Sequence, residues 1–110
     1  MDNIKNDDYY LSKIKENLHF ICKHMEKIEK EDFDQNELLQ DSMSFRLVQI
    51  SEDAKKLTEE YRNNSTQIPW NDIYGLRNRI VHDYGNVDFT IIFETLKNDI
   101  PEVLKLIEKN

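Results

Sequence analysis

The chain has 110 residues, of which 38% are hydrophobic and 34% are charged, and its formal net charge is −7 at pH 7. This length fits a single domain, residues 1–110, with one modest core. Two glycines and two prolines leave few tight turns, which argues against a fold with many β-strands. The acidic balance argues against broad, nonspecific nucleic-acid binding, because such binding needs an extended basic surface. Any contact with RNA is therefore expected to come from a small local patch.

Cellular location and metal content follow from what the sequence lacks. The first residues contain no apolar run, and no segment reaches the apolar length of a membrane span. We therefore expect a cytoplasmic protein that does not enter a membrane. The one cysteine, Cys22, cannot form an intramolecular disulfide, and a zinc site would need histidines and carboxylates. His82, Asp83 and Asp88 could supply them, but their spacing is not diagnostic, so we predict neither metal nor cofactor.

A first amphipathic helix is predicted from about residue 7 to residue 30. Apolar residues recur there at alternating steps of three and four, as in helices that pack nearly parallel. Asp7 or Asp8 can cap its start, while His19 and His24 lie off the stripe and are expected on the surface. The stripe consists of Leu11, Ile14, Leu18, Ile21, Met25 and Ile28.

A break is predicted over residues 31–36, where Asp34 and Glu37 have the spacing of a capping box. A second apolar stripe then predicts either one long helix or two helices joined near residues 41–44. A polar loop over residues 62–67, closed by Pro69, follows it. The stripe consists of Leu39, Met43, Leu47, Ile50, Ala54, Leu57 and Tyr61.

The third helix is predicted to begin at Trp70 or Asn71 and to end at Tyr84, where Gly85 can stop it. Asp88 can cap a last helix, and Pro101 falls inside that helix and should kink or split it. The elements together predict an all-α fold, an antiparallel bundle of four to five helices. The last stripe consists of Phe89, Ile92, Phe93, Leu96, Ile100, Leu104 and Ile107.

The segment from residue 75 to residue 85 carries the residues most suited to chemistry. Two arginines, an asparagine, a histidine and a tyrosine lie within eight residues: Arg77, Asn78, Arg79, His82 and Tyr84. Arginine offers permanently charged donors for a phosphate, and histidine can exchange protons near neutral pH. Together these groups match what metal-free RNA cleavage needs, namely a base for the 2′-hydroxyl and a cation for the transition state.

The helical geometry of this segment leaves three arrangements open. Asn78 and His82 share one helix face, but Arg77 and His82 are five residues apart and point about 140° away from each other. Either the helix loosens near His82, or Arg77 bends round it, or two copies of the chain face each other. We favour the third arrangement, in which a twofold axis brings two arginines and two histidines into one cleft.

A purely structural interpretation of the same residues is also open. His82 and Tyr84 would then be buried polar anchors, and the arginines would pair with surface carboxylates. Arg79 is the residue for which a secondary RNA phosphate contact and a structural salt bridge are equally plausible. Tyr84 could pack its ring against Ile80 and Val81 as an aromatic cap.

At these residues the chain resembles the HepT-like family of the HEPN superfamily. The family motif is Arg-x4-His-x-Tyr, and Arg77, His82 and Tyr84 stand at its positions, with Asn78 directly after the arginine. The surroundings are similar as well: residues 68–70 read Ile-Pro-Trp, Gly75 precedes the arginine by two, and residues 87–88 read Val-Asp. At residues 51–54, where relatives usually read Gly-Glu-Ala-Ala, this chain has Ser-Glu-Asp-Ala.

The resemblance implies an all-α HEPN-like fold, a homodimer with both motifs at a shared cleft, and RNA cleavage without a metal. It assigns acid/base chemistry to His82, the phosphate clamp to Arg77, and an orienting hydrogen bond to Asn78. It also implies a toxin whose partner, a minimal nucleotidyltransferase antitoxin, adds AMP to Tyr84. A noncatalytic nucleotide-binding or regulatory subunit of a nucleotidyltransferase complex is the alternative, and the acidic surface favours it slightly.

Overall fold

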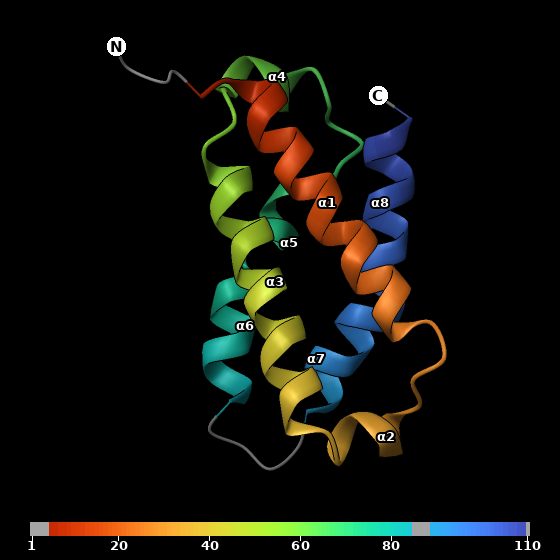
Figure 1. Ribbon diagram of the computed structural model, residues 1–110. Helices are drawn as coiled ribbons and strands as arrows, with labels where there is room; N and C mark the ends of the chain where they lie inside the picture. Colours follow the sequence, from red (N-terminus) through yellow and green to blue (C-terminus); the bar gives the residue numbers. More distant parts are fainter. Residues whose placement is uncertain (1–4, 85–88, 110) are drawn as a thin grey trace.

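The computed structural model describes residues 5–84 and 89–109, and over these residues all regular structure is helical (Figure 1). The predicted all-α class is therefore confirmed. None of the described helices is long and apolar enough to cross a membrane. In chain order the elements are α1 (Asp7–Met25), α2 (Lys30–Asp34), α3 (Glu37–Lys55), α4 (Glu59–Asn63), α5 (Trp70–Tyr74), α6 (Leu76–Asp83), α7 (Thr90–Glu94), the π-helical segment η1 (Thr95–Asp99) and α8 (Ile100–Glu108).

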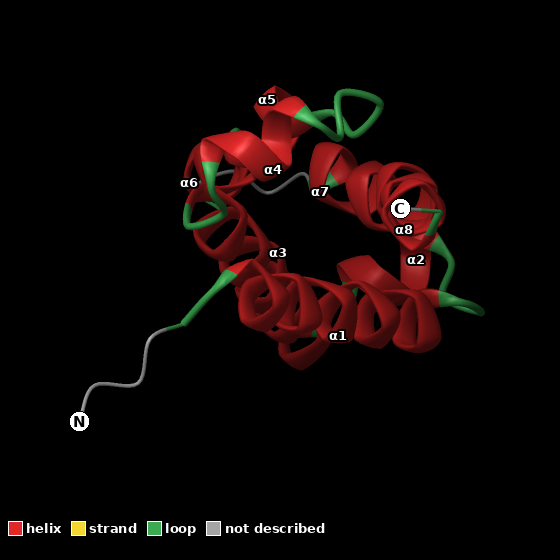
Figure 2. Ribbon diagram, turned by 90° about the horizontal axis from the view of Figure 1, so that it is seen from above, coloured by secondary structure: helices red, strands yellow, loops and turns green. Residues whose placement is uncertain are grey.

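The longer helical segments surround one apolar core, and Figure 2 shows the arrangement of these segments from the end of the bundle. Helices α1 and α3 pack against each other, α5 and α6 pack against α3, and η1 and α8 lie beside α1, while α7 contacts α6 and α2. The short helices α4 and α2 lie at opposite ends (Figure 1). The predicted stripes supply much of this core: Ile14, Leu18, Ile21, Met25, Met43, Leu47, Ile50, Ala54, Ile92, Leu96, Ile100 and Ile107 are all buried.

Helix α1 ends five residues earlier than predicted. Its last carbonyls, those of Met25 and Glu26, accept hydrogen bonds from the Lys97 ammonium at 2.9 and 3.3 Å. A cation at a helix C-terminus satisfies free carbonyls and complements the helix dipole. The predicted cap was also wrong, because Asn6 caps α1 by accepting a hydrogen bond from the Tyr9 amide. The carboxylate of Asp7 instead binds the amide and hydroxyl of Thr58, which joins α1 to the start of α4.

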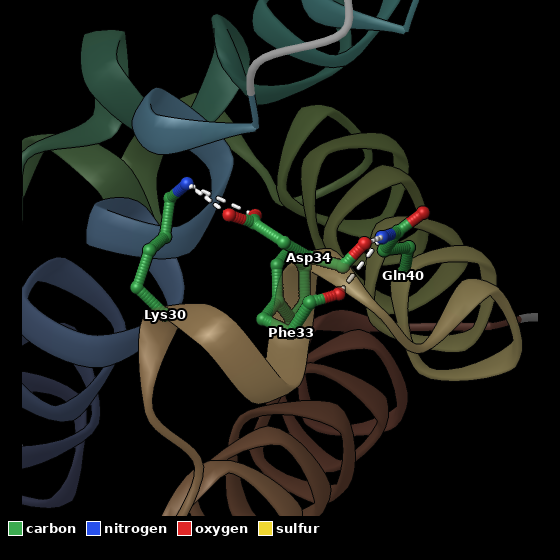
Figure 3. A network of polar contacts seen from close by, with 4 residues as sticks. All are labelled: Lys30, Phe33, Asp34 and Gln40. Carbon is green, nitrogen blue, oxygen red and sulfur yellow. Dashed lines mark hydrogen bonds and ion pairs between the residues drawn. The ribbon is translucent and has the colours of Figure 1, made fainter.

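The predicted break over residues 31–36 contains the short helix α2, which Figure 3 shows from close by. Phe33 is fully buried, and burying a phenylalanine ring stabilises a fold by about 1.5–3 kcal/mol. The Gln40 side-chain amide donates to the carbonyl oxygens of Phe33 and Asp34, at 2.8 and 3.2 Å, and the Lys30 ammonium pairs with Asp34. Asn36, and not the pair Asp34 and Glu37, caps α3. These contacts hold the first turns of α3 in place.

Helix α3 runs unbroken through residues 41–44, so the predicted joint there is wrong, and the single long helix is also wrong because α3 ends at Lys55. The interruption comes later, over residues 56–58, where Thr58 caps the separate helix α4. The predicted effect of Pro101 takes the form of the π-helical segment η1, which precedes it. There the Ile100 amide bonds to the Thr95 carbonyl, five residues back. Proline has no N–H to donate, and its ring clashes with the carbonyl four residues back in a regular helix. The wider π-helical turn moves that carbonyl and so accommodates Pro101. The predicted capping role of Asp88 lies outside the described residues.

Ser51 and Asp53 stand where the family resemblance leads us to expect glycine and alanine, and only one of the two side chains is satisfied by described residues. Ser51 is buried and its hydroxyl donates to the Tyr74 carbonyl at 3.1 Å, so it fastens the end of α5 to α3. Asp53 is only 7% exposed, and its Oδ2 atom has no hydrogen-bond partner in the part of the chain that the structure describes. Burial raises the pKa of this carboxyl, against the opposing influence of nearby lysines such as Lys56 and Lys13.

We expect Asp53→Ala to raise the free energy of unfolding by about 1 kcal/mol at neutral pH, because it removes a buried, unsatisfied carboxylate. The sign follows from the raised pKa of Asp53. The folded protein disfavours the ionised form of Asp53. The loss of stability that this carboxylate causes is therefore complete above the pKa of Asp53 in the folded protein, and it shrinks as the pH falls through that pKa. Urea unfolding of both proteins across the acid range measures the difference. A gain that stayed constant with pH, or a loss of stability, would contradict this account.

Candidate active site

The predicted helix that carries Arg77, His82 and Tyr84 is divided into two helices, and both pack against α3. The predicted helix from residue 70 to residue 84 separates at Gly75 into α5 and α6, although Gly75 N–H still bonds to the Asn71 carbonyl. Glycine in a helix interior costs about 0.5–1 kcal/mol relative to alanine, which makes it a natural joint. The Trp70 indole donates to the Ser65 carbonyl at 3.1 Å, and Ser51 binds the Tyr74 carbonyl. Both ends of α5 are thereby fixed before the motif begins.

Arg77, Asn78 and His82 are all exposed on α6. Because α6 is helical to Asp83, the alternative in which the helix loosens at His82 is wrong. Asn78 and His82 therefore lie one turn apart on one face, and Arg77 points about 140° from His82. The Arg77 guanidinium has no hydrogen bond or ion pair with another described residue. One copy thus presents the two groups on a convex helix surface.

Arg79 differs from Arg77 in its surroundings. Its guanidinium donates to the Thr95 hydroxyl at 3.0 Å and approaches the Asp99 carboxylate at 3.4 Å. These contacts join α6 to η1 across a separation of 16 and 20 residues. These contacts are the ones that a structural role of Arg79 requires, and that role is one of the two that the sequence left open.

Asp83 does not belong to the exposed group. It is buried, and its Oδ2 atom has no hydrogen-bond partner among the described residues. Among the described residues, no three histidine, cysteine, aspartate or glutamate side chains lie close enough to hold a metal ion. The third member of the site considered from the sequence, Asp88, is outside the described residues.

Tyr84 ends α6 and is tied to α3. Its hydroxyl donates a hydrogen bond to the Asp41 carboxylate, and its ring meets the edge of Phe89 at 5.5 Å between ring centres. The side chain is 39% exposed. Burial first, and then the hydrogen bond to Asp41, raise the pKa of Tyr84 to about 12. Because His82 and Tyr84 are both exposed, the interpretation of these two residues as buried anchors is wrong.

Large apolar side chains are exposed beside the motif. Phe45 is 59% exposed and Val81 is 68% exposed. With Val48 and Tyr84 they line an open hollow between α3 and α6, and we call these four residues the α3–α6 patch. The sequence carried a signal that we did not use, since Phe45 and Val48 lie off the predicted stripe of α3. Nothing in the sequence indicated that Asp41 binds Tyr84, because 43 residues separate the two.

Comparison with known proteins gives a consistent family. The model of the family described as Ribonuclease HepT-like matches residues 14–110. A protein of Caldanaerobacter subterraneus subsp. tengcongensis that bears an RNase name is 32% identical over 100 residues, covering 91% of this chain and 89% of that protein. One from Methanocaldococcus jannaschii, also with an RNase name, is 31% identical over 91% of this chain and 83% of its own. A protein of Thermococcus cleftensis, named as a ribonuclease HepT, is 29% identical over 91% of both chains. No solved structure matches the chain.

The contrast between the two arginines can be tested by their effects on stability. We expect Arg79→Ala to lower the free energy of unfolding by about 0.5–1 kcal/mol, since it loses a hydrogen bond and a partly exposed ion pair. Arg77→Ala is the matched control and should unfold like the wild type, because no described residue pairs with its guanidinium. Thermal unfolding measures both. If Arg79→Ala kept full stability but bound RNA more weakly, Arg79 would be a phosphate contact after all.

Proposed function

The chain belongs to the HepT-like ribonuclease family, and we propose that it is the toxin of a prokaryotic HEPN/MNT toxin–antitoxin system, a metal-independent RNA endonuclease. The observation that carries the proposal is the exposed group on α6, Arg77, Asn78 and His82, in an otherwise acidic protein. An exposed histidine, together with an arginine that pairs with no other described residue, supports acid/base chemistry on a phosphodiester. The protein is proposed to act in the cytoplasm.

The proposed reaction uses the RNA's own 2′-hydroxyl as the nucleophile. His82 takes the proton of the 2′-hydroxyl, and the oxygen attacks the adjacent phosphorus. The bond from phosphorus to the 5′-oxygen breaks, and the imidazolium formed at His82 gives its proton to the leaving 5′-oxygen. Arg77 stabilises the charge that develops on the phosphate oxygens. Asn78, one turn before His82, orients the imidazole or the RNA by a hydrogen bond. The products are a 2′,3′-cyclic phosphate and a 5′-hydroxyl end.

We propose that two copies of the chain form the cleft. In one copy Arg77 and His82 diverge, so a second copy is the simplest way to bring both kinds of group to one phosphate. The α3–α6 patch supports this arrangement, because Phe45, Val48 and Val81 lie beside the motif and would be covered by the same residues of a second copy, with Tyr84 left at the rim of the interface. Contiguous exposed apolar surface of this kind is typical of protein interfaces.

We also propose that a minimal nucleotidyltransferase antitoxin controls the enzyme by adding AMP to Tyr84. The hydroxyl of Tyr84 lies at the end of α6, two residues after His82, and the side chain is partly exposed. An adenylate on this oxygen would add bulk and negative charge next to the groups that are meant to hold the RNA phosphate. Both effects oppose RNA binding.

We expect His82→Ala and Arg77→Ala each to abolish RNA cleavage while the fold stays intact, because both side chains are exposed. Loss of the proton transfer alone is typically worth a factor of about 10²–10⁴ in rate. The measurement is cleavage of a labelled single-stranded RNA in EDTA, with His24→Ala as the matched control. His24 is an exposed histidine on α1, so this variant should keep full activity.

The chemistry of the products separates this proposal from its alternatives. Substrates with 2′-deoxy or 2′-methoxy groups should resist cleavage. Activity that disappears in EDTA, or products with 5′-phosphate ends, would indicate a metal nuclease. Binding of RNA or nucleotide without any cleavage by the wild type would favour the noncatalytic regulatory subunit.

The dimer is tested separately by placing a charge in the α3–α6 patch. We expect Phe45→Lys to halve the molar mass in light scattering and to lose cleavage, since two lysines would meet near the twofold axis. Ile91→Lys is the matched control, because Ile91 is 54% exposed but lies on α7, outside the patch. A wild type that stays monomeric at tens of micromolar, or an active monomeric variant, would refute the composite cleft.

A further inference from the structure

The side chain of Tyr84 is fixed at both ends. Its hydroxyl donates a hydrogen bond to the Oδ1 atom of Asp41 on α3, and its ring rests against the edge of Phe89 at an interplanar angle of 82°. Phe89 in turn packs edge-on against the buried Phe33. The phenol oxygen therefore has one defined position, next to a carboxylate that a different helix supplies.

The negative charges around the Tyr84 phenol favour its protonated form. The carboxylates of Asp41 and Glu37, both on α3, act on it, and Phe89, its contact ahead of α7, is uncharged. Burial and these carboxylates raise the pKa of Tyr84 to about 12. At neutral pH the population of phenolate is therefore negligible. A reaction in which the Tyr84 oxygen acts as a nucleophile needs a proton acceptor at the moment of attack.

We propose that Asp41 is that acceptor, the general base that activates Tyr84 for transfer of a nucleotide. This inference rests on the proposed modification of Tyr84 and adds the residue that makes it possible. The Tyr84 oxygen attacks the α-phosphorus of a nucleoside triphosphate and forms the new O–P bond. The bond between the α-phosphorus and the bridging oxygen breaks, and pyrophosphate leaves. The phenolic proton passes to Oδ1 of Asp41, which is exposed and can release it to water.

Other groups near Tyr84 fit this role less well. Glu37 lies one turn before Asp41 on the same helix and affects Tyr84 only through its charge, without a hydrogen bond. Ser44 is neutral at any relevant pH and is a poor proton acceptor. Asp83 is buried, so it could not return a proton to water as readily. Asp41 combines direct contact, negative charge and access to solvent.

The test compares Asp41→Asn with Glu37→Gln, a matched control that removes the same charge from the same face of α3. Each protein is incubated with the partner nucleotidyltransferase, ATP and Mg²⁺, and the adenylate on the peptide containing Tyr84 is followed by mass spectrometry. We expect Asp41→Asn to slow the modification by a factor of about 10²–10⁴, the usual value of a general base, and Glu37→Gln to change it only a few-fold. Tyr84→Phe defines the background.

A second measurement needs no partner. Ultraviolet titration of each protein, with the Tyr84→Phe spectrum subtracted, gives the pKa of Tyr84. Asp41→Asn should lower this pKa from about 12 toward the ordinary value of 10.0, because the carboxylate that favours the protonated phenol is gone. Asp41→Glu, which keeps the carboxylate on a longer arm, should recover part of the modification rate. Asp41→Ala, which also lacks the carboxylate, replaces Asp41→Asn if that variant does not fold.

The outcomes separate the inference from the function on which it rests. Wild-type protein without adenylate on Tyr84 would refute the proposed modification itself, whatever the titration shows. Adenylate on the wild type, together with an equal rate in folded Asp41→Asn, would overturn the role of Asp41 and leave the modification standing. A faster rate in Asp41→Asn would also overturn it, because the hydrogen bond would then be a restraint that the partner has to break.

Discussion

The packing of α3 against the motif helix determines the geometry of the site. Ser51 holds the carbonyl at the end of α5, and Asp41 holds the hydroxyl at the end of α6. Between them, the buried Ile80 packs in the same core as Leu47. A helix of eight residues is too short to be stable alone, so α6 depends on these contacts. The exposed side of α6 is consequently held still while it carries Arg77, Asn78 and His82.

The ends of α3 are in turn fixed by elements far away in the sequence. At its start, α2 is anchored by the buried ring of Phe33 and by the Gln40 amide. At its end, the Asp7 carboxylate binds Thr58, just beyond the last turn. Polar contacts thus define where the helix begins and where the chain leaves it, while the apolar core supplies most of the stabilising free energy. The position of Asp41, on which Tyr84 depends, follows from both.

The apolar periodicity was enough to predict the longer helical stretches but not the short helices α2 and α4, and the polar contacts decided where the helices end. The stripes of α1, α3 and the last helix were predicted correctly because burial repeats every three or four residues. The end of α1 was missed because its cap, Lys97, comes 71 residues after Glu26. The division at Gly75 was missed because glycine lowers helix stability without excluding a helix. Long-range hydrogen bonds leave no local pattern in a sequence.

The candidate site was predictable to the same extent. Local spacing indicated that Asn78 and His82 share a face, and the regular helix agrees with this. Spacing could not show that Arg79 is paired and Arg77 is not, because the partners of Arg79, Thr95 and Asp99, lie on another segment. The patch around Phe45 could have been recognised, because an apolar residue off the buried stripe of a helix has no core to enter.

Tyr84 links the chemistry, the interface and the proposed control, because it is a member of three sets of contacts at once. It follows His82 in the motif, it lines the α3–α6 patch, and its oxygen is bound to Asp41. An adenylate on that oxygen would have to displace the hydrogen bond and would bring a phosphodiester anion next to the Asp41 carboxylate. Two negative charges at contact distance repel each other, so the modified side chain would turn away from α3. The available direction is toward the exposed surface of α6, where Arg77 carries a permanent positive charge. Under the proposed function, the repulsion from Asp41 would therefore help the attached nucleotide occupy the place of the RNA phosphate.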